Sequence, residues 1–326
     1  MQIFEKLTKN ILKTNDQGYA LFYYNNGHIL EKVNGKVSDE ASEDINYNTN
    51  FRLASVSKQF IAFSIVNLIL ENKISYETNI LTIFSDLPSY FKNITIKNLL
   101  NHTSGIYDYE DMDHQEDDPQ VVDKDILDFL KTKNDTYFAV GTKYKYSNTA
   151  YILLGLIVEK ISGFSISDYI ENNVFKKAGM NKSKVNIQGV TEIENRAYGH
   201  LLDSSNNLYV KDQYWCSATI GDGGLYSSIN DLKKWCQYLV NTPNFVEMKV
   251  PNYVGDTEYN FYGLGIRTIE VDGHLIHYHC GDTIGTNTLL LLSIDLNLCL
   301  IFLTNLGGID TEIMKNNLVE LIKGKI

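Results

Sequence analysis

The feature that most constrains this chain is an apolar segment, residues 60–70, which directly follows a Ser-x-x-Lys tetrapeptide at residues 55–58. The segment predicts a buried helix, and it is too short to cross a lipid bilayer. Ser55 and Lys58 lie at its start, one helical turn apart. The free backbone N–H groups and the positive potential of a helix start favour negative charge at that place.

Strand-like segments occur at both ends of the chain. The expected strands are 18–24, 28–33, 261–271, 274–279, 286–294 and 298–305, and the expected helices are 1–13, 55–70, 149–162, 228–239 and 310–323. We expect an α+β fold in which the strands of both ends form one antiparallel sheet flanked by the terminal helices. Residues 1–74 and 256–326 would form this α/β domain, and residues 75–255 would form a mostly helical inserted lobe. The active site would lie in the cleft between them.

Composition and charge exclude several classes of protein. The chain has 326 residues and a net charge of −11 without a basic cluster, which argues against nucleic acid as a partner. Its first 13 residues carry charges throughout and lack the apolar core of a signal peptide, so we expect a cytoplasmic protein. The four cysteines form no Cys-x-x-Cys pair and show no metal-ligand spacing, so we expect reduced thiols and no metal or cofactor.

Ser55 and Lys58 together predict a nucleophile, because a lysine amine can take or steer the proton of the serine. The same spacing recurs at Ser89 and Lys92, but no long apolar helix follows that copy. Only the first copy has a buried helix that would hold the lysine close to the serine and away from bulk water. The alternative is that Ser55 merely caps a helix and that Lys58 is a solvated lysine in its first turn.

Tyr146 and Asn148 precede the helix expected at 149–162. A tyrosine between two cationic groups ionises more easily and can act as a general acid or base. The side chain of Asn148 can hold the lysine or a substrate amide. A similar Tyr-x-Asn occurs in the hairpin turn at residues 24–26, so the pattern alone is weak. The alternative is a packing tyrosine and an asparagine helix cap.

A His-Cys-Gly-Asp segment, residues 279–282, lies at the end of an expected strand. Gly281 would let a substrate approach the strand backbone. The backbone N–H of Asp282 would complete an oxyanion hole with the N–H of Ser55. His279 would place a donor or a positive charge beside it. The alternative is a histidine in a strand and a glycine in a turn.

The three elements, in this order, resemble the serine β-lactamase and penicillin-binding-protein superfamily. The resemblance is to its class C-like branch, which includes DD-peptidases, D-aminopeptidases and related esterases. Residues 51–60, 99–105, 221–227 and 262–265 also look like this family, so the resemblance extends from residue 17 to residue 305. It implies a β-lactamase/transpeptidase-like fold.

The resemblance also implies a role for each motif residue. Ser55 would be the acylated nucleophile, and Lys58 would share its proton. Tyr146 would act as the base in acylation and activate water in deacylation, although whether Lys58 or Tyr146 is the primary base stays open. Asn148 would contact the substrate amide.

The third motif departs from the Lys-Thr-Gly of many family members. His279 and Gly281 match it, but Cys280 stands where a threonine helps to hold a substrate carboxylate, and a thiol is a poor donor. Asp282 adds negative charge, so both changes argue against a carboxylate-bearing substrate. The acidic run at 108–118 would favour amine-bearing substrates if it overhangs the cleft, and the alternative is a solvated, mobile loop.

We therefore expect a serine hydrolase that forms an acyl-enzyme through Ser55 and cleaves a small amide or ester. A D-amino-acid peptide, an ester and a β-lactam are the candidate substrates, and Cys280 argues against a true β-lactamase. The alternative is a non-catalytic ligand- or penicillin-binding protein on the same fold. The presence of Ser55, Lys58, Tyr146 and His279 together argues against this alternative.

Overall fold

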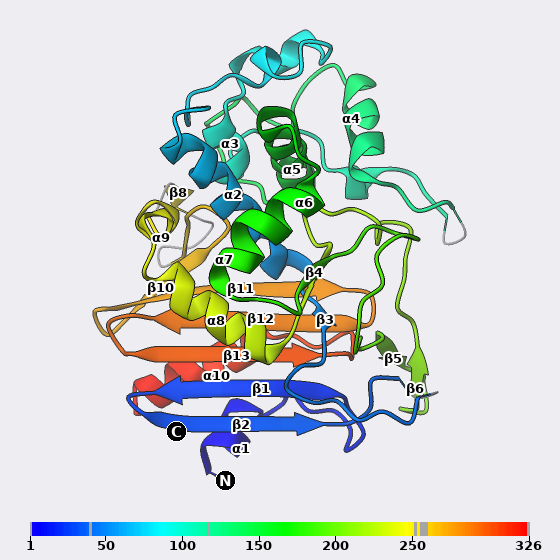
Figure 1. The fold of residues 1–326 in the computed structure, drawn as a ribbon, viewed down its shortest axis with the longest axis vertical. Coiled ribbons are helices and arrows are strands. Elements are labelled where there is room, and N and C mark those ends of the chain that lie inside the picture. The colour runs from blue at the N-terminus through cyan, green and yellow to red at the C-terminus, as the bar shows by residue number, and fades with distance from the viewer. Residues whose placement is uncertain (1, 39–40, 116–117, 251–252, 255–259, 325–326) are drawn as a thin grey trace.

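The computed structural model describes residues 2–38, 41–115, 118–250, 253–254 and 260–324 (Figure 1). Its largest element is an antiparallel sheet of eight strands in the order β2-β1-β13-β12-β11-β10-β9-β8. The strands are β1 (Tyr19–Asn25), β2 (His28–Asn34), β8 (Tyr253–Val254), β9 (Asn260–Tyr262), β10 (Arg267–Val271), β11 (His274–Thr283), β12 (Thr286–Ser293) and β13 (Leu298–Thr304). Because β1 pairs with β13, both ends of the chain share one sheet, which confirms the expected arrangement.

The two terminal helices, α1 (Gln2–Leu7) and α10 (Glu312–Ile322), pack on one face of this sheet. Leu7 of α1 and Met314 of α10 lie in one buried cluster with Phe302 of β13. Every residue of β12 is buried, as is typical of a strand whose two faces are both covered. The terminal helices therefore flank the sheet as predicted.

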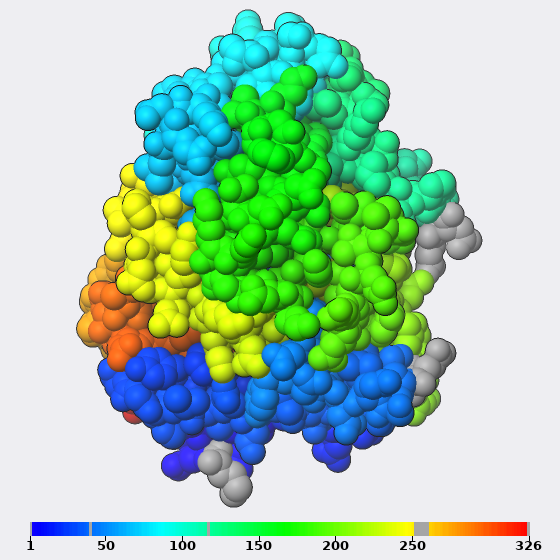
Figure 2. All heavy atoms as spheres, viewed as in Figure 1, coloured from blue at the N-terminus to red at the C-terminus, as the bar shows by residue number. Residues whose placement is uncertain are grey.

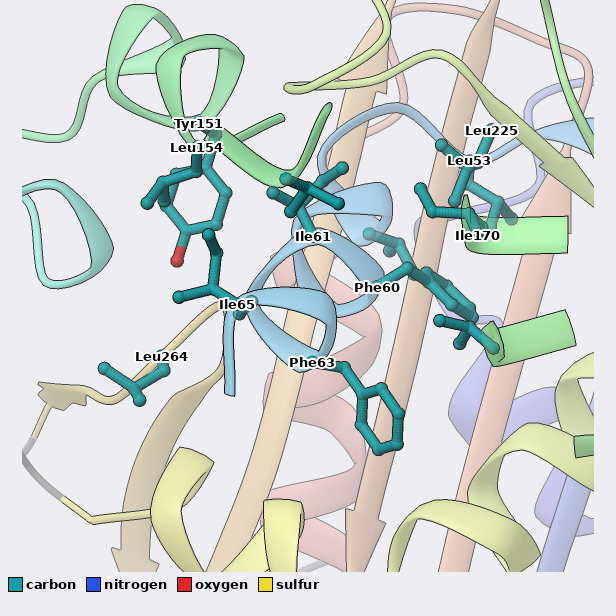
Figure 3. Close-up of a cluster of buried hydrophobic side chains, with 14 of the residues drawn as sticks. Leu53, Phe60, Ile61, Phe63, Ile65, Tyr151, Leu154, Ile170, Leu225 and Leu264 are labelled. Carbon is teal, nitrogen blue, oxygen red and sulfur yellow. The ribbon is translucent and has the colours of Figure 1, made fainter. Parts of the chain in front are cut away.

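The opposite face of the sheet belongs to a larger core that contains α2 (Lys58–Leu70) and α5 (Asn148–Ser162). The α2 side chains of Phe60, Ile61, Phe63 and Ile65 point in different directions, and all of them are buried (Figure 3). Burial of each such side chain stabilises the fold by about 1.5–3 kcal/mol. This packing fixes the start of α2 in the middle of the molecule.

The stretch between the two halves of the sheet is mostly helical. Figure 2 shows its cyan and green parts stacked above the blue N-terminal strands. Its helices are α3 (Ile96–Leu100), α4 (Asp123–Lys131), α5, α6 (Ile166–Ile170), α7 (Lys176–Ala178), α8 (Ile229–Leu239) and α9 (Pro243–Met248). Two small sheets accompany them, one of β3 (Phe51–Arg52), β7 (Leu225–Ser227) and β4 (Lys184–Val185), the other of β5 (His200–Leu202) and β6 (Leu208–Val210). The domain boundaries near residues 74 and 256 stay a prediction.

The strand predicted over 261–271 is two strands in the structure, because the chain turns between β9 and β10. Gly265 in this turn has a φ of +71°, and a Cβ there would lie 2.6 Å from the carbonyl oxygen of Lys58. The glycine therefore lets the turn contact the start of α2 directly. The next strand, β11, continues to Thr283 rather than ending at His279.

Among the described residues, no single helix is both long enough and apolar enough to cross a membrane. Taken together, α5 and the helical segment 166–178 are long and apolar enough to span a membrane, but the two are bent by 81° relative to each other. The apolar residues of this pair, such as Leu153 and Val174, lie in the larger core.

Candidate active site

Ser55 lies just before α2 rather than on it. It belongs to a short 3₁₀ turn, η1 (Ala54–Ser57), which links β3 to the helix. Ala54 has a φ of +48°, a left-handed conformation that is costly for a residue with a side chain. Such local strain often marks functional sites, and here it sets the orientation of the residue before the expected nucleophile.

Lys58 is fully buried at the first position of α2. Its Nζ donates to Ser55 Oγ at 3.0 Å, to Asn148 Oδ1 at 2.6 Å and to the carbonyl oxygen of Asp222 at 2.9 Å. These three contacts hold the amine of Lys58 beside the hydroxyl of Ser55. The alternative of a solvated lysine beside a capping serine is therefore wrong.

Asn148 is the first residue of α5, and the cap of this helix is Ser147, whose hydroxyl accepts from the N–H of Ala150. The capping alternative for Asn148 is therefore wrong. Its side chain joins two groups, since Oδ1 accepts from Lys58 and Nδ2 donates to Glu110 Oε1 at 2.9 Å. The Asn148 amide is thus held in one orientation between a cation and an anion.

Tyr146 lies against the same lysine, with Lys58 Nζ 5.0 Å from the centre of its ring. Its hydroxyl is buried and has no hydrogen-bond partner among the described residues. His102, from the segment 99–105, supports the tyrosine: its ring lies 4.4 Å from that of Tyr146, and its Nδ1 accepts from the N–H of Ser147. An unpartnered hydroxyl beside a lysine is available to exchange a proton with substrate.

His279 is buried and lies within hydrogen-bond distance of the hydroxyl of Tyr262 through Nε2, at 3.2 Å. Burial, aided by Arg267 and Lys58, holds the pKa of His279 well below its usual range. This direction favours a neutral His279 over the positive charge, which was one of the two roles expected from the sequence. The cation on this wall is Arg267 of β10, whose guanidinium lies 5.5 Å from the ring centres of Tyr146 and Tyr262.

Gly281 brings β11 against the turn that carries Ser55. A Cβ at this position would lie 2.3 Å from the carbonyl oxygen of Leu53, so only glycine fits. The thiol of Cys280 lies 3.5 Å from Glu312 of α10, and both residues line the same cleft as Ser55. Burial raises the pKa of Cys280 to about 12. Asp282 follows at the edge of the cleft, and its backbone N–H as an oxyanion donor stays a prediction.

The acidic run does not form a solvated loop throughout. Asp108 and Tyr109 are buried, and Asp108 accepts from the backbone N–H of Asn148 at 2.7 Å. Glu110 follows in a short 3₁₀ turn, η4 (Tyr109–Asp111), and lines the cleft. Residues 116 and 117 lie outside the described residues.

A cleft of about 630 Å³ joins these groups. Its lining includes Ser55, Tyr146, Asn148, His279 and Asp282, and Lys58 lies buried directly behind Ser55. A larger cavity of about 760 Å³, near His200, holds none of these catalytic candidates.

Sequence reasoning missed Arg267 as a member of the site. It also gave no individual role to His102, Glu110 or Asp222, although each lies in a segment that resembles the family or in the acidic run. Arg267 is a charged residue in the strand that pairs with β11, opposite Tyr278 and so beside the third motif. This position is the signal that would have identified it.

The site has a serine hydrogen-bonded to a buried lysine, an asparagine at the start of a second helix, a tyrosine just before that helix, and a strand along the opposite wall. This arrangement is typical of serine hydrolases. Comparison with known proteins gives the family. A family model described as Beta-lactamase matches residues 4–322. The chain therefore belongs to the Beta-lactamase family, within the serine β-lactamase and penicillin-binding-protein superfamily, which confirms the resemblance.

Penicillin-binding protein 4* of Bacillus subtilis (strain 168) is 31% identical over 278 residues, which cover 79% of this chain and 61% of that protein. Among solved structures, the octameric penicillin-binding protein homologue from Pyrococcus abyssi gives a TM-score of 0.84 at 22% identity over 99% of this chain and 76% of that one. The D-amino acid amidase from Ochrobactrum anthropi SV3 gives 0.81 at 20% identity over 99% and 98%. These structures confirm the predicted fold. The chain spans only 61% of the length of the Bacillus relative, so similarity to that protein does not assign its activity to this chain.

Proposed function

We propose that this protein is a serine hydrolase that forms an acyl-enzyme at Ser55 with a small amide or ester. The observation that carries the proposal is the 3.0 Å contact between Lys58 Nζ and Ser55 Oγ, in a buried network that opens onto the cleft. Family membership supports the hydrolase class, and a fold neighbour is named as a D-amino acid amidase.

In acylation, Ser55 Oγ would bond to the substrate carbonyl carbon, whose oxygen takes up the π electrons. The serine proton would pass to the unprotonated member of the pair, the neutral amine of Lys58 or the phenolate of Tyr146. The same groups would then return a proton to the departing amine or alcohol. The backbone N–H groups of Ser55 and Asp282 would stabilise the negative oxygen of the tetrahedral intermediate. In deacylation, a water molecule would lose a proton to the pair, add to the acyl carbon and release Ser55.

The structure changes the argument about substrate charge. Cys280 lies 3.5 Å from Glu312 of α10, and both residues line the cleft, so this position still lacks the hydroxyl donor of a threonine. Arg267 lines the cleft, and a guanidinium is a good partner for a carboxylate. We therefore keep carboxylate-bearing substrates such as short D-amino-acid peptides in the proposed class, together with amino acid amides, simple esters and β-lactams.

The test is intact-protein mass spectrometry after exposure to a fluorescent penicillin, p-nitrophenyl acetate and D-phenylalaninamide. We expect an acyl adduct on Ser55 with at least one of them, and Ser55→Ala should lower the hydrolysis rate by about 10³-fold or more. Ser89→Ala is the matched control and should behave as the wild type. An adduct that persists in Ser55→Ala would contradict the proposal. Tight ligand binding without any adduct would favour the non-catalytic alternative.

A further inference from the structure

A narrow recess of about 40 Å³ opens beside Ser55 on the acidic side of the cleft. Glu110, Asn148 and Asp222 line it together with Ser55. Its volume is close to that of one water molecule, so it has room for one small polar group.

Asp222, which lines this recess, has an unused hydrogen-bond acceptor. The residue is only 7% exposed, and its Oδ2 accepts from the hydroxyl of Tyr109 at 2.9 Å. Its Oδ1 is buried and has no hydrogen-bond partner in the part of the chain that the structure describes. A buried carboxylate oxygen without a donor costs free energy, so the site favours a ligand that brings a donor.

Glu110 adds a second carboxylate at the entrance. It is exposed to the open cleft, and its Oε1 accepts from Asn148 Nδ2. Partial desolvation, together with the negative charges of Asp108 and Asp222, raises the pKa of Glu110 to about 7, although Lys58 acts in the opposite direction. An added positive charge would relieve this repulsion.

The cations already present do not satisfy these carboxylates. The amine of Lys58 is already in contact with Ser55, Asn148 and the backbone oxygen of Asp222. Arg52, which also lines the recess, donates to the carbonyl oxygens of Ser217 and Gly223. Its Nη1 is without a described partner, so a water molecule between Arg52 and Asp222 is the competing occupant.

We propose that this recess and Glu110 bind the protonated amine of the substrate, so that the enzyme favours substrates with a free primary amine close to the scissile carbonyl. The inference rests on the proposed acyl-enzyme function and names its substrate class. The ammonium group would donate to Asp222 Oδ1 and to the Glu110 carboxylate, and both contacts would be charge-assisted.

The test measures binding to the Ser55→Ala protein, which cannot form the acyl-enzyme. Isothermal titration calorimetry near neutral pH compares phenylalaninamide, as both enantiomers, with its N-acetyl derivative, which lacks the charged amine. We expect the better free-amine enantiomer to bind roughly tenfold more tightly than its acetylated form, as one charge-assisted hydrogen bond would give. Equal affinity, or no measurable binding of either, would overturn the proposal, and a water molecule in the recess predicts that equality.

Two further variants separate amine binding from other roles of Glu110. Glu110→Gln keeps an acceptor for Asn148 but loses the charge, so it should remove most of the preference for the free amine. Asp111→Asn removes a charge one residue away, outside the lining of the cleft, and should keep that preference. A preference that survives Glu110→Gln would overturn the assignment of Glu110. If p-nitrophenyl acetate fails to acylate the wild type, the proposed function fails while this binding result still stands.

Discussion

Two Ser-x-x-Lys tetrapeptides in this chain have the same spacing and different structures. Lys58 is fully buried and makes three hydrogen bonds, one of them to Ser55. Ser89 and Lys92 lie in a short 3₁₀ helix, η3 (Ser89–Asn93), and both are exposed. The spacing brings the serine and the lysine into one turn in both places, but only at the first does tertiary packing bury the lysine against the serine, as the proposed nucleophile requires.

The difference comes from the residues on the C-terminal side of each copy. The helix after Lys58 has large apolar side chains on several sides, such as Phe60, Phe63 and Ile65, so it must be buried (Figure 3). Lys58, at its start, is buried with it. Asn148 and Asp222, which are distant in sequence, then supply hydrogen-bond acceptors for the buried amine of Lys58. Substitutions that remove one of these supports should make the first copy behave like the second.

The largest effect is expected for Lys58→Met, which keeps the length of the side chain and removes its charge. We expect the acylation rate with p-nitrophenyl acetate to fall by about 10³-fold, as for loss of a positioned acid–base group. The free energy of unfolding should fall by about 1–3 kcal/mol, because Asn148 and Asp222 lose their donor.

Lys92→Met is the matched control for this substitution. Lys92 is exposed, so the variant should keep the acylation rate and should change the free energy of unfolding by no more than about 0.5 kcal/mol. Stopped-flow measurement of the p-nitrophenol burst and urea unfolding check both quantities. Equal losses of rate in the two variants would show that the buried network is not what distinguishes the copies.

Tyr146→Phe is expected to have the next largest effect, and it separates rate from stability. The hydroxyl has no partner among the described residues, so its removal should cost little stability. The acylation rate should fall by about 10²-fold if this hydroxyl moves the proton.

Tyr24→Phe tests the other Tyr-x-Asn pattern. The hydroxyl of Tyr24 accepts from Asn297 on the surface of β1, far in sequence from the site, and its loss should leave the burst unchanged. A Tyr146→Phe protein with the wild-type rate would instead assign the proton transfer to Lys58 alone.

Local patterns were sufficient to predict much of the fold. The hairpin of β1 and β2, the long apolar helix and the strands near the C-terminus each follow from a period or a turn signal within a few residues. The pairing of β1 with β13 was also predictable, since strands at both ends needed partners. The turn at 263–266 was missed because its apolar residues continue the strand pattern on either side.

The electrostatics of the site were harder to predict. His279 was expected to offer a donor or a positive charge, but whether a histidine is charged depends on how completely the fold desolvates it and on neighbours such as Arg267. Arg267 reaches the cleft only because β10 pairs with β11, and Asp222 does so only because its loop packs behind Ser55. The register that pairs Arg267 with Tyr278 could have been counted from the turn at residues 272–273, whereas the path of the loop that carries Asp222 follows from no local pattern.

The smallest predicted effect concerns the loop that carries Asp222. Among the described residues, the second Ser-x-x-Lys copy has no such loop against its lysine. Asp123 of α4 accepts from the backbone N–H groups of Ile220 and Gly221, just before the Asp222 carbonyl that holds Lys58. Burial raises the pKa of Asp123 to about 8. Between its ordinary pKa and this value, the folded protein keeps a proton that the unfolded chain releases. The free energy of unfolding therefore falls as pH rises through this range, and the fall ends near pH 8.

Asp123→Asn removes this titration, so the wild type should lose stability relative to the variant as pH rises from 6 to 8. The expected loss is about 1 kcal/mol per pH unit, close to the value for one proton. Urea unfolding of both proteins across this range measures it, and the difference should level off above pH 8. Parallel curves would mean that Asp123 is already ionised, and that the loop behind Lys58 is held by a charge rather than by a neutral acid.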